Sequence, residues 1–174
     1  HRSTPVNTTT TGVTLAGAAI ALTILVIQLR KWWTGGRALK DLFPTIQGLL
    51  TGALGTVCAG GLLGWLAGCT RQAANGAGGK VVTGTTGTES GAPLASGTLG
   101  QLTPEGGVVV FLLAVVLVLS YKAANKEDKG KLLGALAAGF ILCATAGVAG
   151  MLEGLPDLVN ALGTSGRNAL EGQL

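Results

Sequence analysis

The sequence predicts an all-α membrane protein whose four transmembrane helices form two tandem helical hairpins, joined by a long outer linker rich in Gly, Ser and Thr. Composition is the first observation. Of the 174 residues, 48% are hydrophobic and only 11% are charged, whereas soluble domains carry about 25% charged residues. Glycine occurs 30 times and aromatic residues make up only 4%. Small residues that let backbones approach closely are typical of packed membrane helices.

The second observation is where the charges are absent. Four stretches carry no Asp, Glu, Lys or Arg: 3–29, 42–70, 106–121 and 132–152. About 20 apolar residues cross a bilayer as a helix, and Lys122 can extend the short third stretch by reaching toward the interface. An apolar run can also be a buried strand, but a lone strand in lipid leaves its backbone unpaired. We therefore expect helices over 12–33, 44–68, 106–123 and 132–153.

These helices divide the chain into five segments. They are a polar N-terminal tail (1–11), a first hairpin (12–69), an exposed linker (70–105), a second hairpin (106–154) and a short C-terminal interfacial segment (155–174). Most of the tail and of the linker is rich in Thr, Gly and Ser and almost uncharged, as expected of exposed segments without a core of their own. The chain starts at His1 rather than Met, which is compatible with processing or with trimming.

Basic residues mark the two turns within the hairpins. Eight of the twelve lie there: Arg30, Lys31, Arg37, Lys40, Lys122, Lys126, Lys129 and Lys131. The positive-inside rule places both turns in the cytoplasm and leaves the N-terminus, the linker and the C-terminus outside. We expect a bacterial inner membrane as the location. Trp32 and Trp33 are expected interfacial anchors, and Trp65 is expected at the opposite interface.

Glycines four residues apart lie on one face of a helix and allow close helix contact. The expected packing residues are Gly48, Gly52, Gly60, Gly64, Gly68, Gly139, Gly147 and Gly150. Several such faces on only four helices predict a homo-oligomer. The hairpins also suggest an internal duplication with parallel repeats, since 56–60 and 141–145 have similar sequences. The alternative is that any two helices of Gly, Ala and Leu look alike.

Residues for catalysis or metal binding are missing from the sequence. Its one histidine is His1, the carboxylates lie at helix ends or in loops, and Cys58, Cys69 and Cys143 have no metal-binding spacing. We expect no catalytic residue, no metal, no cofactor, no small-molecule substrate and no enzyme activity. Residues 66–69, LAGC, match a lipobox, but we favour the outer end of a helix, where Gly68 stops the helix and Arg71 reaches the head groups. Lipidation of Cys69 is the alternative.

Tandem glycine-rich hairpins with basic turns resemble the proteolipid subunits of rotary ATPases. That family carries its ion on a carboxylate in mid-membrane, in the second helix of a hairpin. The corresponding positions near Cys58 and Cys143 hold no Asp or Glu, and Glu153 lies at a helix end. We therefore do not expect ion translocation.

Each half of the chain also resembles the major pilins of conjugative and other type IV secretion pili, which are hairpins of two apolar helices with a short basic cytoplasmic turn. The resemblance lies in topology and composition, and those pilins carry one hairpin where this chain has two. It implies a subunit that is stored in the inner membrane and then extracted into an extracellular helical tube. The eight basic residues would face the lumen and lipid head groups.

Such crowded basic turns need anions. Anionic phospholipid is the expected bound molecule, and a nucleic-acid cargo would neutralise the turns as well; a protein cargo is also compatible with a tube. Two other functions remain open. One is a small pore-forming or transfer protein of the membrane, such as a holin or a plasmid-spread protein. The other is a non-catalytic subunit of a larger membrane complex.

Overall fold

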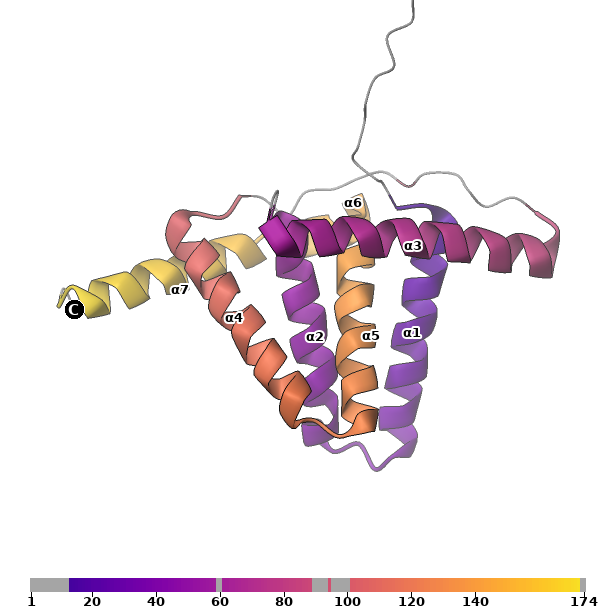
Figure 1. Ribbon diagram of the computed structural model, residues 1–174, viewed down its shortest axis with the longest axis horizontal. Coiled ribbons are helices and arrows are strands. Elements are labelled where there is room, and N and C mark those ends of the chain that lie inside the picture. Colours follow the sequence, from indigo (N-terminus) through magenta and orange to yellow (C-terminus); the bar gives the residue numbers. More distant parts are fainter. Residues whose placement is uncertain (1–12, 59–60, 89–93, 95–100, 173–174) are drawn as a thin grey trace, which may run out of the picture.

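The computed structural model describes residues 13–58, 61–88, 94 and 101–172, and in this part of the chain the predicted all-helical class is confirmed. Seven helices are present there: α1 (Leu15–Thr34), α2 (Leu39–Val57), α3 (Gly61–Thr86), α4 (Pro104–Ala123), α5 (Lys126–Leu142), α6 (Ala146–Met151) and α7 (Leu155–Leu170). Helices α1, α2, α4 and α5 run between the two ends of the molecule, and α3 and α7 lie across one end (Figure 1).

Two of these helices, α1 and α4, are each 20 residues long and apolar enough to cross a membrane alone. Helix α2 together with α3 would add a third span if the bent pair is counted as one. Both α1 and α4 begin at a threonine whose hydroxyl accepts a hydrogen bond from the backbone N–H three residues later. The caps are Thr14 with Gly17 and Thr103 with Gly106.

The expected continuous helix over 44–68 is wrong. Helix α2 begins earlier, at Leu39, and ends at Val57, and α3 leaves it at an angle of 103°. The bend follows from Gly61, whose φ of 75° is a left-handed conformation that glycine adopts freely. Helix α3 then continues through Gly68 to Thr86, so the expected stop at Gly68 is also wrong.

The expected linker over 70–105 therefore begins with helix. Residues Ala74 and Gly78 of α3 are buried, and a Cβ at Gly78 would meet the backbone of Ala16 in α1. Contact with α1 stabilises helix in a segment whose Gly and Thr content alone disfavours it.

The expected continuous helix over 132–153 is broken as well. Helix α5 ends at Leu142, and the short helix α6 starts after Thr145. The Thr145 hydroxyl donates a hydrogen bond to the Leu142 carbonyl, 2.7 Å away. This bond satisfies a carbonyl that the helix end leaves without an intrahelical partner.

Helices α2 and α5 cross in close contact at two glycines. A Cβ added at Gly52 would lie 3.0 Å from the Gly139 Cα, and a Cβ added at Gly139 would lie 3.0 Å from the Gly52 Cα. Gly52 also faces backbone atoms of Leu136 and Phe140, while Gly139 faces those of Leu49 and Ala53. The contact is therefore reciprocal: each glycine faces the residue three positions before, and the residue one position after, the glycine of the other helix.

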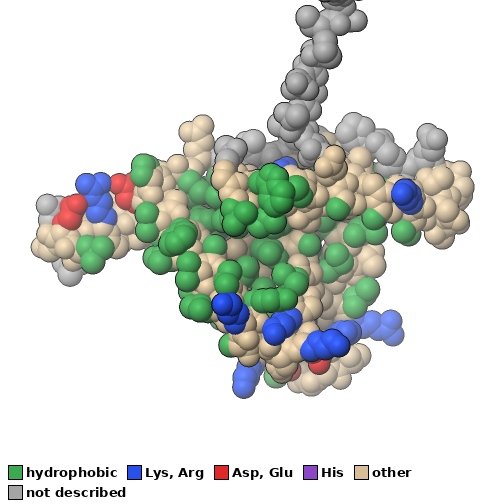
Figure 2. All heavy atoms as spheres, in the orientation of Figure 1, with side chains coloured by type: hydrophobic (Ala, Val, Ile, Leu, Met, Phe, Trp, Pro, Cys, Tyr) green, Lys and Arg blue, Asp and Glu red, His purple; other side chains and the backbone are tan. Residues whose placement is uncertain are grey.

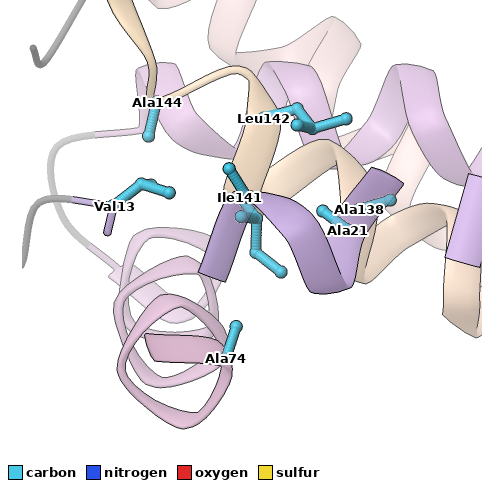
Figure 3. Packing of buried hydrophobic residues seen from close by; sticks show 8 residues of the cluster. Val13, Ala21, Ala74, Ala138, Ile141, Leu142 and Ala144 are labelled. Carbon is cyan, nitrogen blue, oxygen red and sulfur yellow. The ribbon is translucent and has the colours of Figure 1, made fainter. Parts of the chain in front are cut away.

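Small residues also build the packing of α1, α3 and α5. The buried cluster contains Val13, Ala18, Ala21, Ala74, Ala138, Ile141, Leu142 and Ala144 (Figure 3). Most members are alanines, so few large side chains separate the three helices, Ile141 and Leu142 of α5 being the largest. This close approach is the packing expected from a chain with few aromatic residues.

Candidate functional site

The two turns that carry the basic residues lie at the same end of the molecule. The α1–α2 and α4–α5 connections are both at the end opposite α3 (Figure 1). Figure 2 shows Lys and Arg side chains gathered at this end, with hydrophobic side chains exposed above them. The structure thus brings together basic residues that are far apart in the sequence; Arg30, Lys31, Arg37, Lys40, Lys122 and Lys126 are exposed, and Lys129 and Lys131 are half-buried.

Three of these cations have partners within the chain. The Arg37 guanidinium lies 3.8 Å from the centre of the Trp33 ring, and the Lys129 ammonium lies 5.4 Å from that of Tyr121, both cation–π distances. The Lys131 ammonium pairs with Glu127 at 3.4 Å and Asp128 at 3.3 Å. Lys31 and Lys126 have no carboxylate within ion-pair distance among the described residues.

A groove of about 470 Å³ lies between α1 and α5 and is lined by these two lysines and by apolar residues. Lys31 and Lys126 line it together with Ile24, Ile27 and the small residue Gly134. Next to it, a smaller and more polar cavity of about 290 Å³ is lined by Asp41, Glu127 and Asp128 among others.

Gln28 lines both the groove and the cavity. Its amide donates to the Lys131 carbonyl at 3.0 Å, and its buried Oε1 has no hydrogen-bond partner among the described residues. The groove therefore combines an apolar part, formed by Ile24 and Ile27, with a charged part formed by Lys31, Lys126, Lys131 and Glu127. Among the described residues, no group of three His, Cys, Asp or Glu side chains is placed to hold a metal ion.

The predicted packing glycines have different surroundings. Gly48, Gly52 and Gly139 lie at the α2–α5 crossing, where an added Cβ would meet backbone atoms. Gly68, Gly147 and Gly150 have open space where a Cβ would be. Gly64 is half-buried in α3, and Gly60 lies outside the described residues. Only some of the predicted glycines are therefore contact points between helices of one chain.

A second set of contacts repeats in the two halves and was missed in the sequence. The side-chain oxygen of Asn75 accepts hydrogen bonds from the backbone N–H and the hydroxyl of Thr14, at 2.9 and 3.0 Å. The side-chain oxygen of Asn160 accepts the same pair from Thr103, at 2.9 and 3.2 Å. We call these the Thr–Asn clamps. The first fixes α3 to the start of α1, and the second fixes α7 to the start of α4.

Glycines surround both clamps at matching positions. A Cβ at Gly17 or at Gly106 would collide with the clamp asparagine, and one at Gly78 or Gly163 would collide with the backbone at the start of α1 or α4. The signal in the sequence is the motif N-x-x-G, which occurs once in each half, at 75–78 and 160–163; its partner T-x-x-G, at 14–17 and 103–106, also occurs elsewhere in the chain. Each half thus has a first helix whose cap is clamped to a later, transverse helix, and we call α1–α3 and α4–α7 the two repeats; the second also contains the short helix α6. Gly52 and Gly139 take matching positions in the α2–α5 crossing, and by the same offset Thr56, rather than Cys58, corresponds to Cys143 in sequence position.

The second repeat has an additional ionic contact. Arg167 of α7 donates hydrogen bonds to Glu105 of α4 at 2.8 Å and to Glu171 at 2.9 Å. These bonds, first the one to Glu171 and then the one to Glu105, raise the pKa of the Arg167 guanidinium. Arg167 is therefore a fixed, paired charge on α7.

The residues at the expected outer interface lie on α3. Trp65 is 63% exposed, and Cys69 is exposed one turn further along the helix. Arg71 is half-buried, and its Nε donates to the Ala67 carbonyl at 3.2 Å. None of the three ends a helix, because α3 runs on past them.

No protein-family model, no curated protein and no solved structure matches this chain. The functional conclusion therefore rests on the arrangement of its own residues.

Proposed function

We propose that the chain is a four-span membrane protein in which α1, α2, α4 and α5 cross the bilayer. Both basic turns face the cytoplasm, and α3 and α7 lie at the outer surface. The shared position of the two turns supports this arrangement, because two parallel hairpins then obey the positive-inside rule together. The exposed apolar wall between the ends also supports it, with Val26 at 61% and Phe111 at 63% exposure.

We further propose that the protein is a structural, self-assembling subunit of a secretion or conjugation tube, similar to a pilin. The observation that carries this proposal is the basic end of a repeated pair of hairpins. In a tube, many copies of this end would line the lumen beside anions. The groove lined by Lys31 and Lys126 fits an anionic phospholipid, with its phosphate near the lysines and an acyl chain along Ile24 and Ile27.

A second candidate is a resident subunit of a larger membrane complex, without extraction from the bilayer. The observation that favours it is α3, which lies across the ends of neighbouring helices and makes the outer end wider than the turn end (Figure 1). A hairpin pilin has no such transverse helix. The two candidates differ in the object that the purified protein forms.

Negative-stain electron microscopy of membranes, culture medium and detergent-purified protein distinguishes them. A pilin-like subunit gives filaments outside cells, and washed filaments contain anionic phospholipid by mass spectrometry. Charge reversal at Lys31 and Lys126 together should then reduce bound lipid and filament number while leaving membrane insertion unchanged. Reversal at Arg71 and Lys80, far from the turns, is the matched control. Discrete particles without filaments would contradict the tube and favour the resident complex.

A further inference from the structure

Helix α7 extends away from the other helices and has three distinct faces. One face contacts α4 through Val159, Asn160 and Gly163. A second face is apolar and exposed, with Leu158 at 59% and Leu162 at 56% exposure. The third face is polar and includes Asp157, Thr164 and Glu171. The apolar face covers nothing within the described part of the chain, although α7 is packed on α4 beside it.

The apolar face of α7 is directed toward the turn end of the molecule. In Figure 2, hydrophobic side chains lie on the lower side of the projecting helix, and charged side chains lie on its upper side. In this view, the lower side of the helix is the side nearer the turn end of the molecule.

The second Thr–Asn clamp fixes the depth of α7. Asn160 binds Thr103, the cap of α4, and α4 is 20 residues long. A helix of 20 residues is about 30 Å long, which equals the hydrocarbon thickness of a bilayer. If α4 spans the bilayer, its first residue lies at the hydrocarbon boundary, and α7 lies in that plane.

From this placement we propose that α7 docks on the outer surface of the bilayer, with Leu158 and Leu162 in the boundary between head groups and acyl chains. Amphipathic helices bind membranes in this way. The proposal rests on the four-span arrangement proposed above. Basic side chains usually add attraction to anionic lipid, but Arg167 is paired with Glu105 and Glu171. A zwitterionic surface therefore suffices as the partner, and anionic lipid should add little.

The test uses the full chain in phosphatidylcholine vesicles, with Trp32, Trp33 and Trp65 replaced by Phe and one new Trp as a reporter. Leu162→Trp reports the apolar face, Thr164→Trp the polar face, and Val116→Trp the middle of α4. Lipids brominated on their acyl chains quench a Trp that reaches them. We expect strong quenching for Leu162→Trp and Val116→Trp, at least twofold stronger than for Thr164→Trp, and no change when phosphatidylglycerol is added.

The outcomes separate the two proposals. Quenching at position 116 with none at 162 would overturn the docking of α7 and leave the spans intact. Equal absence of quenching at 116 and 162 would overturn the four-span arrangement. A third result is a Trp at position 162 that escapes quenching and becomes shielded from solvent as the amount of protein per vesicle rises. That result would mean that a second copy of the chain, rather than lipid, covers the apolar face.

Amide exchange on the chain with its native tryptophans gives an independent readout. Leu162→Asp should accelerate exchange across α7 in vesicles, whereas Thr164→Asp should leave it unchanged. Equal exchange in the two variants would also overturn the docking proposal.

Discussion

The two repeats share their Thr–Asn clamps, but their helices pack differently against the rest of the molecule. Helix α1 packs tightly on α5, where Gly134 contacts Ile24 and Gln28. Helix α4 meets α2 through a hydrogen bond between Gln47 and Ser120 at 3.2 Å. An apolar groove of about 580 Å³ runs along α4, between this helix and the start of α3. Helix α1 thus packs on α5 more extensively than α4 packs on α2.

The transverse helices α3 and α7 also differ in how closely they pack on the other helices. Helix α3 lies across the ends of the bundle with small residues toward it: Ala67 is fully buried and Ala74 is 7% exposed. Helix α7 projects outward (Figure 1), and its Leu158 and Leu162 are exposed. The comparison teaches that the clamp determines where a transverse helix is attached.

The largest expected effect concerns the orientation of the repeats. With Cys58, Cys69 and Cys143 replaced by Ala, Lys40→Cys and Lys126→Cys should both resist an impermeant thiol reagent in intact cells, while Thr86→Cys is labelled. Parallel repeats require both turns to behave alike, since both are basic and lie at the same end. Labelling of one turn but not the other would mean that the repeats are inverted. Labelling of both turns in cells that protect position 86 would reverse the whole topology.

The next effect concerns the contact between the repeats. Gly52→Leu and Gly139→Leu should each destabilise the fold by about 3 kcal/mol, the upper part of the usual range for overpacking, because the new side chain meets backbone rather than a movable side chain. Gly147→Leu is the control, since it faces open space. Thermal unfolding in one detergent measures all three. If Gly147→Leu is as damaging as Gly52→Leu, the crossing is not the main contact.

Much of the fold can be predicted from the sequence because the distribution of charged and hydrophobic residues can be followed along the whole chain. Helices close to α1 and α4 follow from the uncharged apolar runs, which predicted 12–33 and 106–123, and the two turns follow from clustered basic residues. The bend after α2 was missed because residues 42–70 are uniformly uncharged. Its signal was Gly60-Gly61, where the second glycine takes a positive φ.

The missed parts of the site depend on long-range contacts. Residues 70–86 look like a linker by composition, and only their packing on Ala16 and Gly17 makes them helical. The Thr–Asn clamps join residues about 60 positions apart, at separations of 61 and 57. No local propensity reports such a pair. The repeated motifs become visible once the two halves are aligned by their caps rather than by Cys58 and Cys143.

The smallest expected effect separates the two clamps. Asn75→Ala and Asn160→Ala each remove the acceptor for a threonine N–H and hydroxyl. Leaving a buried donor unpaired costs about 1–3 kcal/mol, whereas an exposed donor can bind water instead. Thr14 is half-buried and Thr103 is exposed. Asn75→Ala should therefore cost about 1–2 kcal/mol more than Asn160→Ala.

The second repeat also keeps an ionic contact when its clamp is removed, since Arg167 still joins α7 to Glu105 when Asn160 is lost. Thermal unfolding gives the stability difference, and amide exchange tells which helix is released: α3 in Asn75→Ala and, to a smaller extent, α7 in Asn160→Ala. Asn75→Asp keeps an acceptor oxygen at the same position and should recover part of the loss. Equal destabilisation by the two alanine variants, or no recovery by Asn75→Asp, would mean that the clamps do not act through these hydrogen bonds.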